Sequence, residues 1–122
     1  MFEVSVSMSF SAAHNLREYR GKCEELHGHN WKVEAAFRRR GLDKTGMVAD
    51  FVVLKKTLKD VLDELDHKYL NAIGDFKKAN PTSEHIARWV FERLKKKFSG
   101  KGIRVSYVKV WETDQNCAVY TE

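Results

Sequence analysis

The sequence predicts an α+β fold in which two helices pack on one face of a four-stranded antiparallel sheet. Two segments near the N-terminus and two near the C-terminus alternate apolar and polar residues, as half-buried strands do. Between them, apolar residues recur every three or four positions, as on one face of a helix. The order strand, strand, helix, helix, strand, strand inserts both helices between strands two and three.

The two N-terminal strands show the clearest alternation. Residues 2–11 place five apolar side chains on one side: Phe2, Val4, Val6, Met8 and Phe10. Residues 29–40 repeat the pattern with Trp31, Val33, Ala35 and Phe37, and end in three arginines before a turn between Gly41 and Gly46. Each segment therefore predicts a strand with one buried face.

The two helices follow from the change in period. The first begins at Phe51, where Asp50 can cap the free backbone N–H groups, and its apolar stripe reaches Leu65 over about four turns. The second follows Pro81, because proline is tolerated at a helix entry but not in its interior, and it ends at Gly100. Its stripe consists of Ile86, Ala87, Val90, Phe91, Leu94 and Phe98.

The last two strands are predicted over residues 103–112 and 116–121. The apolar phase shifts from Val105 and Tyr107 to Val108 and Val110, which predicts a bulge or a strand covered on both faces. The predicted sheet has two open edges. Association with other copies of the chain is one way to cover them.

The composition indicates one domain over residues 1–122. Such a chain can form a core without metal or disulfides, so any metal is expected to be functional. With 22 basic and 17 acidic residues the net charge is +5, which favours anionic partners. The cysteines are far apart and no signal-peptide pattern is present, so we expect a cytoplasmic protein. No apolar run approaches the roughly 18 residues of a membrane span, so we expect no membrane partner.

Three histidines form a candidate metal site. His27 and His29 enclose Gly28 at the start of the second strand, and residues two apart point to the same side. His14 follows the first strand in the phase of its apolar face, so pairing of the two strands brings three imidazoles together. Three neutral imidazoles leave one position open on a tetrahedral zinc ion, as in catalytic sites. The alternative is a chance pair beside a surface histidine.

Three further features could perform chemistry. Cys23 lies close enough to His27 in sequence to face the same ion as a proton acceptor or nucleophile. The alternative for a lone cysteine is a small buried thiol, and this is the interpretation we give to Cys117. Asp66 could orient His67 as an acid or base, although adjacent side chains usually diverge. Glu112 could accept two parallel hydrogen bonds from an amidine-like ligand edge, or could simply be exposed.

Two basic runs, at residues 38–40 and 95–97, are typical of solvated faces. A nucleic-acid surface would interleave aromatic and basic side chains, whereas the three tryptophans fall within or beside the apolar stripes. We therefore expect no nucleic-acid partner.

Five segments, taken together and in order, resemble the 6-pyruvoyltetrahydropterin synthase family. They are residues 10–14 (FSAAH), 23–30 (CEELHGHN), 65–71 (LDHKYLN), 80–84 (NPTSE) and 111–113 (WET). The resemblance spans nearly the whole chain. Because three residues separate Cys23 from His27, the chain is most similar to the bacterial 6-carboxytetrahydropterin synthase branch.

The resemblance implies the tunnelling fold (T-fold), in which three four-stranded sheets form a barrel and two trimers stack into a homohexamer. The site residues that it implies are His14, His27 and His29 for zinc (Zn²⁺); Cys23, Asp66 and His67 for proton transfer; Glu112 for anchoring the pterin ring; and Thr82 for lining its pocket.

The implied activity is that of a lyase that converts 7,8-dihydroneopterin triphosphate to 6-carboxy-5,6,7,8-tetrahydropterin, acetaldehyde and triphosphate, an early step toward queuosine. Glu24 leaves an alternative open, because another branch has the motif E-x-x-H-G-H and cleaves dihydroneopterin to 6-hydroxymethyl-dihydropterin for folate synthesis. Glu24 would then contact the substrate. A 6-pyruvoyl product is a further alternative. A different class is a non-catalytic, zinc-containing module that binds nucleotides or RNA.

Overall fold

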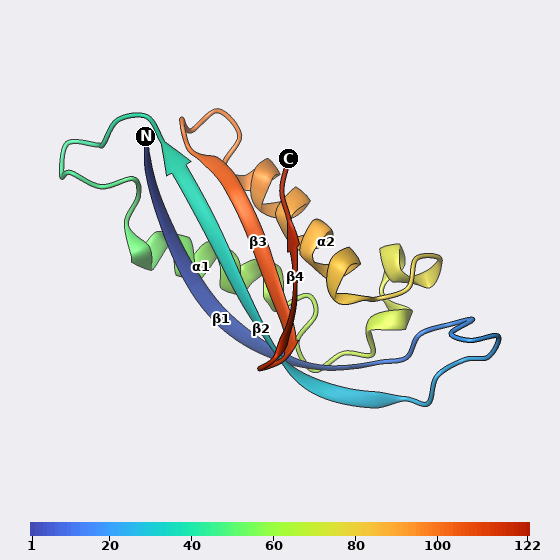
Figure 1. The fold of residues 1–122 in the computed structure, drawn as a ribbon. Coiled ribbons are helices and arrows are strands. Elements are labelled where there is room, and N and C mark those ends of the chain that lie inside the picture. The colour runs from blue at the N-terminus through green and yellow to red at the C-terminus, as the bar shows by residue number, and fades with distance from the viewer.

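The computed structural model describes residues 1–122. Its elements, in chain order, are β1 (Phe2–His14), β2 (His27–Arg39), α1 (Phe51–Leu62), the short 3₁₀ helices η1 (Leu70–Ala72) and η2 (Gly74–Lys77), α2 (Ser83–Lys97), β3 (Arg104–Thr113) and β4 (Asn116–Tyr120). The strands form one antiparallel sheet in the order β1-β2-β3-β4, and α1 and α2 lie on one face of it (Figure 1). The predicted fold class is confirmed.

Strands β1 and β2 form a long ladder that reaches beyond the predicted bounds. It runs without interruption from Phe2 opposite Arg39 to His14 opposite His27. β1 continues past the predicted end at residue 11, because Ala12 and His14 keep the buried phase of the strand. β2 begins at His27 rather than at residue 29. The ladder therefore includes all three candidate metal ligands.

The helices begin where their caps predict. The Asp50 carboxylate accepts the Val52 N–H at 2.8 Å, and Thr82 caps α2 by accepting the His85 N–H at 3.1 Å. Pro81 precedes this cap and so lies outside the helix. α1 ends at Leu62, earlier than predicted, although Leu65 is still fully buried by the turn that follows.

The phase shift in β3 is a bulge. Ala36 of β2 lies opposite Tyr107, but the next residue, Phe37, lies opposite Val105, so Ser106 is extra in the ladder. An extra residue reverses the side-chain alternation, which explains why Val108 and Val110 are buried. The bulge alternative of the prediction is therefore correct.

The sheet has edges at β1 and β4, and one of them is partly covered. The Ser11 carbonyl accepts the His67 N–H at 2.6 Å, and the Ala13 N–H donates to the Lys68 carbonyl at 3.1 Å. The segment after α1 thus pairs with the last part of β1. The first part of β1 and the outer side of β4 remain open in the single chain.

The core lies between the helices and the sheet. Its largest fully buried side chains include Trp31 and Phe37, on the face of β2 that the helices cover. Phe37 packs against Phe98 with ring centroids 5.0 Å apart. Neither helix has the length and apolar character needed to cross a membrane.

We predict that Phe37→Ala lowers the free energy of unfolding by about 3–5 kcal/mol, because it removes a fully buried ring and leaves a cavity. Phe51→Ala is the matched control, since Phe51 is 53% exposed, and its effect should stay below about 1 kcal/mol. Urea unfolding at a fixed protein concentration measures both. Equal losses would contradict the position of the core.

Candidate active site

Three histidines converge where β1 ends and β2 begins. His14 lies opposite His27 in the ladder, and His29 lies on the same side of β2, two residues further on. The ring centroids are 4.7 Å apart for His14 and His27, 4.8 Å for His27 and His29, and 5.3 Å for His14 and His29. The predicted convergence is confirmed within a single chain.

Two backbone carbonyls fix the orientation of the rings. His14 Nδ1 lies 2.9 Å from the Pro81 carbonyl oxygen, and His27 Nδ1 lies 2.9 Å from that of Glu25. A ring that donates its Nδ1–H in this way keeps an unprotonated Nε2, which is the form that binds a metal. Carbonyl groups have no sequence signature, so the motif analysis could not identify these two partners.

Trp31 packs against the histidine cluster. Its indole ring packs edge-to-face on His14 and His29, with centroids at 4.9 and 5.4 Å. The indole Nε1 donates to the Ala12 carbonyl at 3.3 Å, which fixes the ring on β1. A fully buried tryptophan thus limits the movement of two of the three imidazoles.

Glu112 lies beside the histidines, and its role in anchoring the pterin ring, which the family resemblance implies, stays a prediction. Its Oε1 lies 2.8 Å from His29 Nε2 and 3.5 Å from His14 Nε2. One ring nitrogen from each histidine and one carboxylate oxygen of Glu112 lie within 4.8 Å of one another. The carboxylate at the end of β3 can therefore reach the same ion as the imidazoles.

The cluster fits a divalent metal ion. The Nε2 atoms of His14 and His29 are buried and face the Glu112 carboxylate without a well-directed hydrogen bond to it. A bound cation would satisfy both nitrogens and the carboxylate. Burial lowers the pKa of His29, and the neighbouring imidazoles of His14 and His27 add to this effect while Glu112 opposes it. The neutral form that a metal requires is thus favoured. Three imidazoles with a nearby carboxylate suit zinc.

Cys23 and Glu24 occupy the loop between β1 and β2. Cys23 is exposed and is not a member of the histidine cluster. Two hydrogen bonds hold Glu24 in this loop. Its carboxylate accepts the Leu16 N–H at 3.2 Å, and its own N–H donates to the Leu16 carbonyl at 2.8 Å. The same carboxylate lies 3.7 Å from His27 Nδ1. Glu24 is therefore positioned beside a metal-ligand candidate. Cys117, expected to be buried, is exposed because β4 is an edge strand.

Asp66 and His67 form a pair despite being adjacent in sequence. His67 has a left-handed backbone, with φ of 57°, and its Nδ1 lies 3.0 Å from Asp66 Oδ1. Asp66 Oδ1 also accepts the Ser11 N–H at 2.9 Å, which is the main reason why the pKa of Asp66 lies below its usual range. The His67 ring is 82% exposed. The pair thus faces outward beside β1 and does not belong to the metal-ligand group, although His67 and His29 line the same pocket.

Thr82 has a structural role in the single chain. Its hydroxyl caps α2, directly after the Pro81 carbonyl that holds His14. The start of α2 is therefore fixed relative to the metal-site candidate. A role for Thr82 in lining a pterin pocket stays a prediction.

Comparison with known proteins identifies the family. The sequence profile described as 6-pyruvoyl tetrahydropterin synthase matches residues 3–122. A dihydroneopterin monophosphate aldolase of Pyrococcus furiosus is 40% identical over 107 residues, which cover 88% of this chain and 86% of that protein. A 6-carboxy-5,6,7,8-tetrahydropterin synthase of Synechocystis is 41% identical over 100 residues, covering 77% and 75%.

A solved structure agrees with this result. The 6-pyruvoyl tetrahydropterin synthase of Caenorhabditis elegans superposes with a TM-score of 0.85 at 30% identity, covering 99% of this chain and 95% of that one. The fold is therefore the T-fold of these pterin enzymes. The chain belongs to the 6-pyruvoyl tetrahydropterin synthase family.

We predict that His29→Ala weakens zinc binding by at least roughly tenfold, because it removes one of three converging imidazoles. The matched control is His85→Ala, since His85 is an exposed histidine near the start of α2 and lies outside the cluster. Titration with zinc against a competing chelator measures both affinities. Equal affinities for the two variants would show that zinc binds elsewhere.

Proposed function

We propose that the chain is a zinc-dependent 6-carboxy-5,6,7,8-tetrahydropterin synthase. It converts 7,8-dihydroneopterin triphosphate and water to 6-carboxy-5,6,7,8-tetrahydropterin, acetaldehyde and triphosphate. The main support is the convergence of His14, His27, His29 and Glu112, whose ligand atoms lie within 4.8 Å of one another. The Synechocystis relative that is named for this reaction gives independent support.

The residues of the site would have separate roles in the proposed reaction. Zinc held by the three imidazoles would acidify the side-chain hydroxyls of the substrate. The Pro81 and Glu25 carbonyls keep His14 and His27 in the metal-binding tautomer. Asp66 lies 3.0 Å from His67 Nδ1 and orients this ring, whose exposed edge can pass protons to a neighbouring group. The net charge of +5 favours binding of a triphosphate.

Assembly is part of this proposal. Cys23 and the pair of Asp66 and His67 lie outside the histidine cluster of their own chain. The pair lies beside β1, an edge strand that can pair with another copy. A homohexamer made of two trimers would cover both open edges. It would also bring the proton-transfer residues of one chain to the histidines of another.

A second reaction is favoured by the position of Glu24. Its carboxylate is held 3.7 Å from His27 Nδ1, beside one of the proposed metal ligands. The Pyrococcus furiosus relative is named as a dihydroneopterin monophosphate aldolase. Glu24 could thus act as the base in cleavage of a dihydroneopterin side chain to 6-hydroxymethyl-dihydropterin. The two reactions share the pterin and the metal, and both leave one side-chain carbon on the ring, but only the synthase reaction also expels triphosphate and releases acetaldehyde.

Product analysis tests the proposal. The zinc-loaded protein is incubated separately with 7,8-dihydroneopterin, its monophosphate and its triphosphate, and the pterins are identified by mass spectrometry. We predict 6-carboxytetrahydropterin and acetaldehyde from the triphosphate. Cys23→Ala should reduce this turnover by roughly 100-fold or more, as loss of an acid–base group does. Cys117→Ala is the matched control and should retain turnover.

Three other outcomes contradict the proposal in different ways. Only 6-hydroxymethyl-dihydropterin, lost in Glu24→Gln but not in Glu25→Gln, would establish the aldolase instead. A 6-pyruvoyl product would place the chain with the pyruvoyl-forming enzymes. No turnover of any pterin, together with tight zinc and nucleotide binding, would indicate a non-catalytic module.

A further inference from the structure

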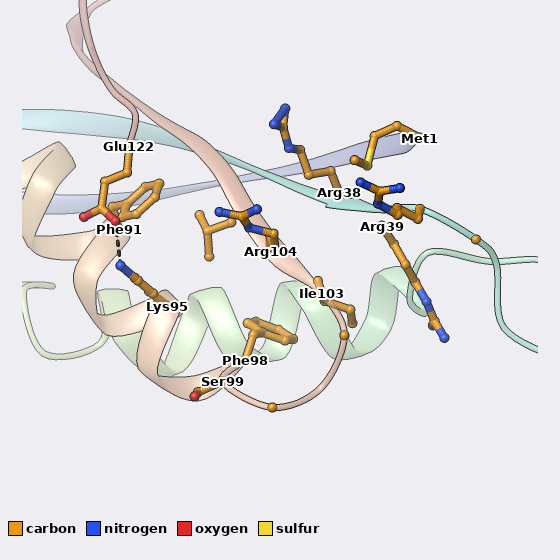
Figure 2. Close-up of a pocket in the computed structure, with 15 residues that line it drawn as sticks. Met1, Arg38, Arg39, Phe91, Lys95, Phe98, Ser99, Ile103, Arg104 and Glu122 are labelled. Carbon is orange, nitrogen blue, oxygen red and sulfur yellow. Dashed lines mark hydrogen bonds and ion pairs between the residues drawn. The ribbon is translucent and has the colours of Figure 1, made fainter.

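A second concave site lies at the other end of the sheet. A cavity of about 670 Å³ opens between the end of β2, the start of β3 and the last turn of α2 (Figure 2). Arg38, in its lining, is eleven residues beyond His27 on β2. At about 3.3 Å per residue, this separates the cavity from the histidine cluster by roughly 35 Å along the strand. The cavity is thus distinct from the candidate active site.

The lining of this cavity is strongly cationic. Its charged side chains are Arg38, Arg39, Arg40, Lys95, Arg104 and Glu122. Lys95 is paired with Glu122, with Nζ 2.6 Å from Oε1, whereas none of the four arginines forms an ion pair. The first basic run and one residue of the second, Lys95, therefore line the same cavity, and Arg104 at the start of β3 joins them.

The strand register concentrates the charge further. Arg38 and Arg104 are direct cross-strand partners, an arrangement of like charges that is destabilising. Glu3 lies opposite Arg38 on the other side, but its carboxylate accepts a hydrogen bond from the Ser106 hydroxyl. Glu3 forms no ion pair with either arginine, and one carboxylate beside two guanidinium groups leaves an excess of positive charge. A bound anion would offset it.

The floor of the cavity is apolar. Phe98 is almost fully buried, and Ile103 and Val105 are half-buried beside it. Figure 2 shows Arg104 extending from the start of β3 toward the pair of Lys95 and Glu122, above this floor. The cavity thus combines an apolar surface with guanidinium groups, which bind phosphate oxygens in a forked geometry.

We propose that this cavity is a binding site for a nucleoside polyphosphate. The phosphates contact Arg38 and Arg104, and the base lies against the half-buried side chains of Ile103 and Val105. The volume is in the range of small-molecule sites. An RNA strand would instead need exposed aromatic platforms along a basic groove, and the aromatic ring here is buried in the floor.

Binding of ATP to the zinc-loaded protein tests this site. We expect saturable binding by calorimetry and a higher melting temperature with ATP, because a ligand stabilises the state that binds it. Arg104→Gln should weaken ATP binding by at least tenfold and abolish the thermal shift. Without ATP, the same variant should melt no earlier than the wild type, because it removes a like-charge contact.

The matched control is Arg88→Gln, since Arg88 lies on α2 but pairs with Glu92 outside the cavity. It should bind ATP as the wild type does. Absence of saturable binding, or equal affinity of ATP for wild type and Arg104→Gln, would overturn the proposal. Tighter binding of a single-stranded RNA than of ATP would overturn it in favour of a nucleic-acid surface. Equal binding of inorganic triphosphate and ATP would overturn the role of the apolar floor.

Discussion

The register between β1 and β2 is the constraint on which the candidate site depends. Because His14 lies opposite His27, and His29 shares the side of His27, one ladder brings three imidazoles together. A shift of one residue would send the ligands of one strand to the opposite face. The buried alternation of Val6 and Phe10 against Trp31 prevents such a shift. The same apolar side chains thus determine the core and the metal-site geometry.

The helical layer completes the site through backbone groups. The segment after α1 pairs with β1, so Ser11 bonds both Asp66 and His67. The turn before α2 presents the Pro81 carbonyl to His14. Folding of the helices onto the sheet is therefore coupled to the orientation of the three histidines and of the Asp66–His67 pair. A substitution that disturbs this packing would therefore impair the proposed reaction even though it changes no candidate metal ligand.

Most of the fold could be predicted from side-chain periodicity, but the ends of its elements could not. β1 reaches His14 because Ala12 and His14 keep the buried phase, although neither is strongly apolar. α1 ends before Leu65. Because Leu65 is buried in the turn that follows, its place in the sequence looks like one more position of the helical apolar stripe. The HxH pair predicted a metal site, whereas the proximity of Glu112 depends on the pairing of β2 with β3. Carbonyl partners and the arginine-lined cavity arise only from the three-dimensional arrangement.

The central claim is that zinc binds through His14, His27 and His29. X-ray absorption at the zinc edge of the zinc-loaded protein tests this most directly. The account predicts three imidazole nitrogens at about 2.0–2.1 Å, with any further ligand an oxygen. Sulfur at about 2.3 Å, which would place Cys23 or Cys117 on the metal, or fewer than three imidazoles, would contradict it.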